Sequence, residues 1–66
     1  MILNIKKIEV ATARSGKTFR EVYREAHISP VTAGRIRKGY EVQPRTAGKL
    51  ATALNCDVTE LIQDGQ

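Results

Sequence analysis

Apolar residues recur at helical spacing near the start of the chain. Ile5, Ile8 and Ala11 stand three residues apart, with polar residues between them. This period predicts an amphipathic helix over residues 4–15. Gly16 follows directly and is the residue type that most readily adopts the left-handed conformation at a helix end.

A second helix is predicted over residues 18–26. Thr18 and Glu21 have the T-x-x-E spacing of a capping box, in which each side chain satisfies a backbone N–H left free at a helix start. Val22 and Ala26 are four residues apart and would form its buried face.

A third helix is predicted over residues 29–38. Ser29 is a preferred N-cap, and Pro30 suits the first helical position, where no N–H is needed. Gly39 closes this helix. The two helices and their short connection predict a helix-turn-helix over about residues 18–38.

The remaining pattern predicts two more helices. Residues 40–43 have no helical period and form a loop, after which Pro44 starts a fourth helix that ends at Asn55. Asp57 then opens a short fifth helix, and residues 64–66 form a polar tail. The prediction is an all-α fold of five short helices in a single domain, residues 1–66.

Composition narrows the possible functions. The chain has 66 residues and a single cysteine, so no intramolecular disulfide forms. Cys56 and His27 are too few to hold a structural metal, and Cys56 is expected to be a buried, unreactive thiol. No set of nucleophile, base and acid is present, and we expect no enzymatic activity, cofactor or small-molecule ligand. No stretch has the length of a membrane span, and a cytoplasmic protein is expected.

Charge is distributed unevenly along the chain. Residues 14–49 carry nine basic and three acidic residues, a net charge of +6, whereas residues 50–66 carry three acidic residues and no Lys or Arg. This asymmetry is typical of a chain with one surface for a polyanion and another for a different contact. The alternative is that these charges are ordinary solvated helix faces.

The sequence of residues 26–39, AHISPVTAGRIRKG, resembles the helix-turn-helix of Cro/C1-type (XRE-like) DNA-binding regulators. Members of that family often read A-G-I-S-x-x-T-I-S-R-I-x-x-G. The resemblance extends through residues 42–58, VQPRTAGKLATALNCDV, and covers nearly the whole chain. It implies a five-helix, lambda-repressor-like fold whose third helix enters the DNA major groove.

The resemblance also implies roles for individual residues. The base-facing candidates on the third helix and at its ends are Ser29, Pro30, Val31, Gly34, Arg35 and Lys38. The phosphate-contacting candidates are Thr18, Arg20, Arg24, Arg37, Tyr40, Gln43, Arg45 and Lys49. Arg35 can donate two hydrogen bonds to guanine, and its alternative role is a phosphate contact. Tyr40 has the alternative of packing its ring on the loop.

Several positions depart from the family pattern. Tyr23 stands where the family commonly has Ala, and His27 replaces the turn Gly, so the left-handed turn must be formed without glycine. Phe19 replaces a Gln that touches phosphate. Thr12 and Arg37 stand where many members have an Arg–Glu ion pair, so Arg37 is free to face solvent or phosphate.

The end of the chain is predicted to form a dimer contact. Val58, Leu61 and Ile62 are the interface candidates, and their alternative role is to close the core against the first helix. Family members often dimerise through this end, and a two-fold dimer reads two half-sites.

The leading hypothesis is a sequence-specific transcriptional regulator, most simply a repressor, that binds double-stranded DNA as a homodimer. The alternatives are a protein-interaction module, either antitoxin-like or an adaptor, and a recombination accessory factor of a mobile element. The first alternative rests on the apolar residues of the third helix, since Pro30, Val31 and Gly34 offer few hydrogen-bonding groups to bases.

Overall fold

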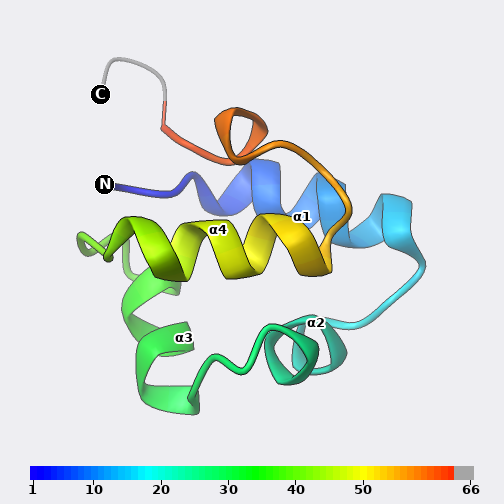
Figure 1. The fold of residues 1–66 in the computed structure, drawn as a ribbon, viewed down its shortest axis with the longest axis horizontal. Coiled ribbons are helices and arrows are strands. Elements are labelled where there is room, and N and C mark those ends of the chain that lie inside the picture. The colour runs from blue at the N-terminus through cyan, green and yellow to red at the C-terminus, as the bar shows by residue number, and fades with distance from the viewer. Residues whose placement is uncertain (64–66) are drawn as a thin grey trace.

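A computed structural model describes residues 1–63 of the chain, and these residues are all-helical. In Figure 1, α1 and α4 cross the middle of the view, α2 and α3 lie below them, and η1 lies above. The elements in chain order are α1 (Ile5–Ser15), α2 (Phe19–Glu25), α3 (Pro30–Arg37), α4 (Pro44–Ala53) and the 3-10 turn η1 (Val58–Glu60). The predicted polar tail, residues 64–66, lies outside the described residues.

Local side-chain caps define the helix starts. The Asn4 side chain accepts a hydrogen bond from the backbone of Lys7, and Ser29 does the same for Thr32 at the start of α3. Such caps satisfy N–H groups that have no partner inside the helix. The predicted helix starts at Asn4 and Ser29 are therefore confirmed.

Left-handed residues end the helices. Gly16 and Gly39 have φ of 75° and 82°, and Asn55 has φ of 56° after α4, as the sequence predicts. His27, in the turn between α2 and α3, also takes a positive φ of 58°. The imidazole residue thus adopts the conformation for which the family pattern uses glycine, and the Ile28 N–H donates to the carbonyl of Tyr23 across the turn.

One large aliphatic side chain from nearly every element meets in the core. The fully buried large residues are Ile8, Val22, Ile36, Leu50 and Leu61. The helix α4 contacts both α2 and η1, and α1 contacts α2. Burial of these side chains is the main driving force for folding this short chain, whose single cysteine is free and forms no disulfide.

The predicted fifth helix is replaced by a single 3-10 turn. Asp57 caps this turn as expected, since its side chain accepts from the backbone of Thr59, but η1 ends at Glu60. Leu61 then enters the core, and the chain continues extended, so a regular α-helix has no room to form. The prediction of five α-helices is wrong at this point: the described residues form four.

Backbone pairing of the N-terminal segment is a feature that the sequence pattern does not predict. Leu3 forms an isolated antiparallel bridge with Ile62. The N–H of Asn4 donates to the Leu61 carbonyl at 2.8 Å, and the N–H of Val42 donates to the Met1 carbonyl at 2.8 Å. Residues 1–4 therefore connect the segment after η1 with the loop between α3 and α4.

Candidate nucleic-acid interface

The helix α3 presents one buried and one exposed face. Ala33 and Ile36 face the core, which fixes the rotation of the helix. Val31 is 75% exposed, the highest value among the large hydrophobic residues of the described chain. Of the predicted base-facing residues, only Gly34 is half-buried; the exposed ones are Ser29, Pro30, Val31, Arg35 and Lys38.

Arg35 packs on the loop that follows its helix. Its guanidinium carbon lies 5.3 Å from the centroid of the Tyr40 ring, and Nη2 donates to the carbonyl oxygen of Glu41 at 3.4 Å. The sequence analysis missed this contact, although the chain reversal at Gly39 is a signal for it. A guanidinium has five N–H donors, so most donors of Arg35 remain available for another acceptor.

The predicted phosphate-contacting residues all have exposed side chains. Tyr40 is 51% exposed even with Arg35 against its ring. The set comes from three helices and the connecting loops: Thr18, Arg20, Arg24, Arg37, Tyr40, Gln43, Arg45 and Lys49. The structure brings Arg20, Arg24 and Arg37 together along one groove, whereas Arg45 and Lys49 project from α4 and do not line it.

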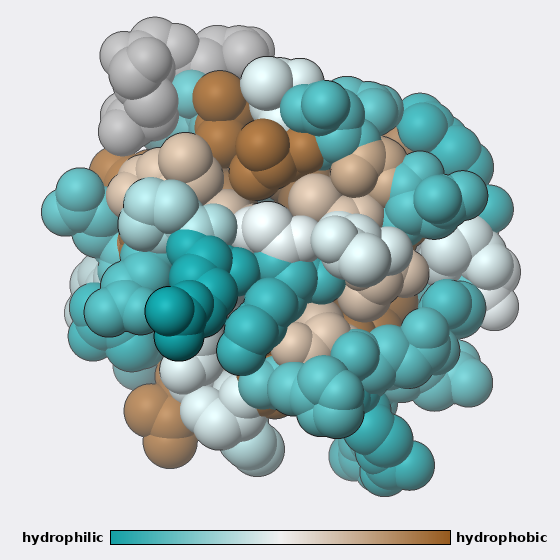
Figure 2. All heavy atoms as spheres, viewed as in Figure 1, coloured by the Kyte–Doolittle hydropathy of each residue, from teal (hydrophilic) through white to brown (hydrophobic). Residues whose placement is uncertain are grey.

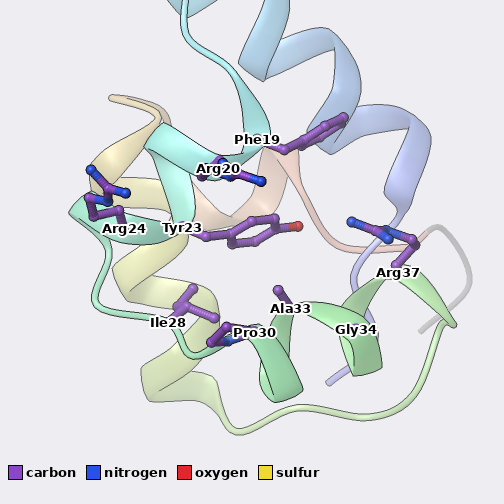
Figure 3. A pocket seen from close by; sticks show the side chains of 9 residues that line it. All are labelled: Phe19, Arg20, Tyr23, Arg24, Ile28, Pro30, Ala33, Gly34 and Arg37. Atoms are coloured by element: carbon purple, nitrogen blue, oxygen red, sulfur yellow. The ribbon is translucent and has the colours of Figure 1, made fainter.

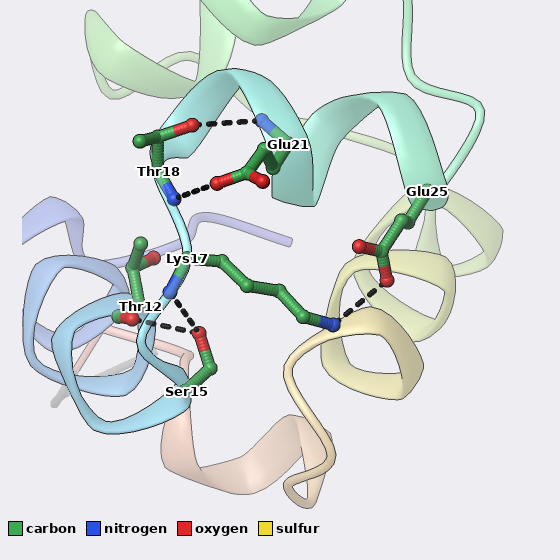
Figure 4. Close-up of polar contacts among 6 residues, drawn as sticks. All are labelled: Thr12, Ser15, Lys17, Thr18, Glu21 and Glu25. Carbon is green, nitrogen blue, oxygen red and sulfur yellow. Dashed lines mark hydrogen bonds and ion pairs between the residues drawn. The ribbon is translucent and has the colours of Figure 1, made fainter.

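The start of α2 already carries a negative charge. In Figure 4, the Thr18 N–H donates to the Glu21 carboxylate at 2.9 Å, and the Glu21 N–H donates to the Thr18 hydroxyl at 3.1 Å. The first of these hydrogen bonds is the main cause that lowers the pKa of the Glu21 carboxyl. A phosphate at Thr18 would therefore meet an ionised carboxylate, which makes Thr18 the least favourable of the predicted phosphate contacts.

Lys17, next to this cap, is engaged in an ion pair. Its Nζ lies 2.8 Å from Oε1 of Glu25, as Figure 4 shows. Arg14, three residues before Lys17 in the last turn of α1, lies 3.6 Å from Glu60. These two cations are locally neutralised, in contrast to the arginines of α2 and α3.

The groove between α2 and α3 has a volume of about 830 Å³. Figure 3 shows the Tyr23 hydroxyl and the Arg37 guanidinium pointing toward one another across it, with Arg20 on the same helix as Tyr23. Burial raises the pKa of the Tyr23 hydroxyl, and the charge of Arg37 partly opposes this rise. The phenol is thus neutral and the groove is positively charged near neutral pH.

The predicted dimer residues differ in exposure. Val58 and Ile62 are half-buried and pack against the core from outside, whereas Leu61 is 0% exposed. Leu61 therefore has no surface to offer a partner, and its assignment to a dimer contact is corrected to a core position. In Figure 2, hydrophobic atoms gather near the top of the view, over the region of η1.

The structure also bears on the predictions about the Cys56 thiol, metal binding and membrane spans. Cys56 is half-buried rather than fully buried, and burial is the main cause that raises the pKa of its thiol. Among residues 1–63, no three His, Cys, Asp or Glu side chains are grouped so as to hold a metal ion. None of the described helices has the length and apolar character needed to cross a membrane.

Comparisons with known proteins add no relative. A scan against protein-family models, a search of curated proteins and a search of solved structures each gave no match for this chain.

Proposed function

We propose that this chain belongs to the class of helix-turn-helix DNA-binding proteins with a lambda-repressor-like fold. Within that class, we assign it the role of a sequence-specific transcriptional regulator, most simply a repressor. It binds a two-fold operator as a dimer, with α3 in the major groove.

The observation that carries this proposal is the separation of charge between two sides of the domain. The exposed surface of α3 and its C-cap bears Arg35, Arg37 and Lys38 and no carboxylate. Asp57 caps η1 and Glu60 is its last residue, and η1 lies on the opposite side of α1 and α4 from α3 in Figure 1. A positively charged side opposite an acidic one favours binding of a polyanion in a single orientation.

In this proposal, some exposed residues read bases and others contact phosphates. Arg35 is the main base-reading candidate, because a guanidinium can donate to O6 and N7 of guanine. Val31, which is exposed on the same helix, would contact a thymine methyl group. The arginines of α2 and the basic residues of α4 flank α3 and would contact phosphates on either side of the groove.

The dimer of this proposal uses the acidic end of the molecule. Val58 and Ile62 are the remaining surface candidates after Leu61 is assigned to the core. A two-fold axis through this end leaves both α3 helices free to enter successive major grooves, about 34 Å apart.

Selection of bound sequences from random duplex DNA tests the proposal. The wild type is expected to enrich a two-fold symmetric motif at near-physiological salt. Arg35→Ala is expected to lose the preference at one position in each half-site, with a cost of about 1–3 kcal/mol on the wild-type site. Arg14→Ala is the matched control, because it removes the same charge from the side near Glu60.

Two outcomes would contradict the proposal. If no motif is enriched and binding stays weak and uniform, α3 does not read bases. If Arg14→Ala and Arg35→Ala reduce binding equally, only net charge matters. For a true regulator, the logarithm of the binding constant falls with log salt by roughly 0.9 per phosphate contacted.

A protein-interaction module is the second candidate. The neighbouring exposed residues Pro30 and Val31 on α3 favour it, because a partner protein that covered them would remove apolar surface from water. This function predicts binding to a protein partner that is insensitive to salt and is lost in Val31→Asp, while Arg35→Ala has little effect.

A further inference from the structure

The groove between α2 and α3 is open on one side and has the size of a ligand site. Its volume of about 830 Å³ lies in the range of small-molecule pockets. Tyr23 helps to form it, because its ring lies between the two helices at a position where the family pattern has a small residue.

The floor of this groove is apolar and partly aromatic. The rings of Phe19 and Tyr23 are stacked, with centroids 6.3 Å apart and an interplanar angle of 18°. Ile28, Ala33 and Gly34 complete the floor. Tyr23, Ile28 and Ala33 are largely covered already, whereas Phe19, Gly34 and Pro30 keep part of their surface exposed. An apolar group that covers this remaining surface gains free energy.

The rim of the groove is cationic. Arg20, Arg24 and Arg37 line it, and no carboxylate does. None of the three takes part in an ion pair among residues 1–63. Two carboxylates lie close to these arginines: Glu21 on α2, whose pKa the charge of Arg24 helps to lower, and Glu9, which lines an adjoining hollow of about 100 Å³ together with Arg37.

Together, these features describe a ligand with two parts. We infer that the α2–α3 groove binds a small amphipathic anion, with an aromatic or aliphatic body on the Phe19–Tyr23 floor and a carboxylate or phosphate beside Arg20 and Arg37. A bare phosphate or a DNA backbone uses the guanidinium groups but leaves the apolar floor uncovered. This site goes beyond the proposed function and replaces the expectation that the chain has no small-molecule ligand.

Occupancy of the groove has a consequence for DNA binding, which rests on the proposed function. Gly34 is a base-facing candidate, and Arg20 and Arg37 are phosphate candidates, yet all three line the groove. A bound anion would neutralise the two arginines and add bulk beside α3. The ligand and DNA therefore compete, and the ligand acts as an inducer.

Binding is tested without DNA, so that failure here is distinct from failure of the regulator proposal. The full isotope-labelled chain is titrated with naphthoate, its neutral isostere naphthalenemethanol, and inorganic phosphate, with amide NMR shifts as readout. Naphthoate is expected to shift residues 19–37 and to bind at least tenfold more tightly than either of the other probes.

Two pairs of variants locate the site. Arg37→Gln is expected to weaken naphthoate binding about tenfold, whereas Arg45→Gln, with the same loss of charge on α4, leaves it unchanged. Gly34→Leu is expected to fill the groove and abolish binding. Gly48→Leu is its control on α4, because a Cβ at either glycine meets no atom within 4 Å.

The inference is overturned by any of four results. Phosphate that binds as tightly as naphthoate shows that the apolar floor contributes nothing. Equal losses in Arg37→Gln and Arg45→Gln show general charge attraction only. Amide shifts centred on η1, or unaltered binding in Gly34→Leu, place the ligand elsewhere. The NMR spectrum of each variant reports directly whether it is folded.

Discussion

Leu61→Ala is expected to destabilise the monomer strongly. The Leu61 side chain is 0% exposed and belongs to the core cluster, which agrees with the alternative to its prediction as a dimer-contact residue. Truncating a fully buried leucine to alanine costs about 2–5 kcal/mol, because transfer free energy is lost and a cavity remains. The total stability of a chain of this length is only about 3–10 kcal/mol, so this single change removes a large share of it.

Urea unfolding followed by circular dichroism measures this loss. The free energy of unfolding is extrapolated to water at two protein concentrations that differ tenfold. A core role predicts a loss that is independent of concentration, whereas an interface role predicts a loss that grows with protein concentration, because mass action stabilises the wild-type dimer. Leu61→Val removes a single methylene and is expected to cost about 1 kcal/mol, which keeps the chain folded.

Val10→Ala serves as the control for Leu61→Ala. Val10 is 52% exposed on α1, and its truncation is expected to cost under about 0.5 kcal/mol. A cost for Leu61→Ala no greater than that of Val10→Ala would refute the core assignment. A loss that depends on protein concentration would restore Leu61 to a dimer contact.

Three further predictions concern single residues. The folded-state pKa of Glu21 is lowered, so its contribution to stability is present above its ordinary pKa near 4.5 and is lost as pH falls through the lowered value. In Glu21→Gln, the free energy of unfolding from urea curves should fall less steeply with pH over this acidic range. Cys56, whose thiol pKa is raised by burial, should react with iodoacetamide more slowly than a cysteine peptide at the same pH, and equal rates would contradict this. His27→Gly should raise the free energy of unfolding by about 1 kcal/mol, because φ is 58° there; a loss of stability in urea unfolding would show that the imidazole itself stabilises the turn.

Local signals account for what the sequence predicts correctly about the fold. The starts of α1, α2 and α3 each depend on a cap that lies within three residues of its partner, such as Thr18 with Glu21. Helix ends at Gly16 and Gly39 depend on a single backbone conformation. These determinants act between residues that are close in the sequence, so the sequence alone is enough to predict them.

Contacts between distant residues account for what the sequence does not predict. The pairing of Leu3 with Ile62 joins the two ends of the described chain, and no pattern near either residue indicates it. That pairing keeps the chain extended after η1, which explains why the expected fifth helix is a single turn. Leu61 has the same apolar character as Ile62, and only the fold decides which of the two is buried.

The candidate site likewise has some features that the sequence predicts and others that only the fold reveals. Exposure of the α3 residues follows from helical period, because Ala33 and Ile36 fix the buried face. The contact of Arg35 with Tyr40 requires the actual path of the loop after Gly39. The sequence therefore indicates which residues reach the surface but not which of them contact one another.

Two residues that line the groove between α2 and α3 differ from the family pattern, and they are far apart in the sequence. Tyr23 is a bulky residue where the family pattern has alanine, and Arg37 is a cation where it commonly has glutamate. In the folded chain both residues line one groove, and Arg37 acts on the pKa of the Tyr23 hydroxyl. The large ring of Tyr23 adds an aromatic surface to the groove, where it stacks on Phe19. The exchange of an acid for a cation at position 37 reverses the sign of the charge at the edge of the groove. The positions that weaken the match to a simple repressor are thus the ones that would give this protein control by a small anion.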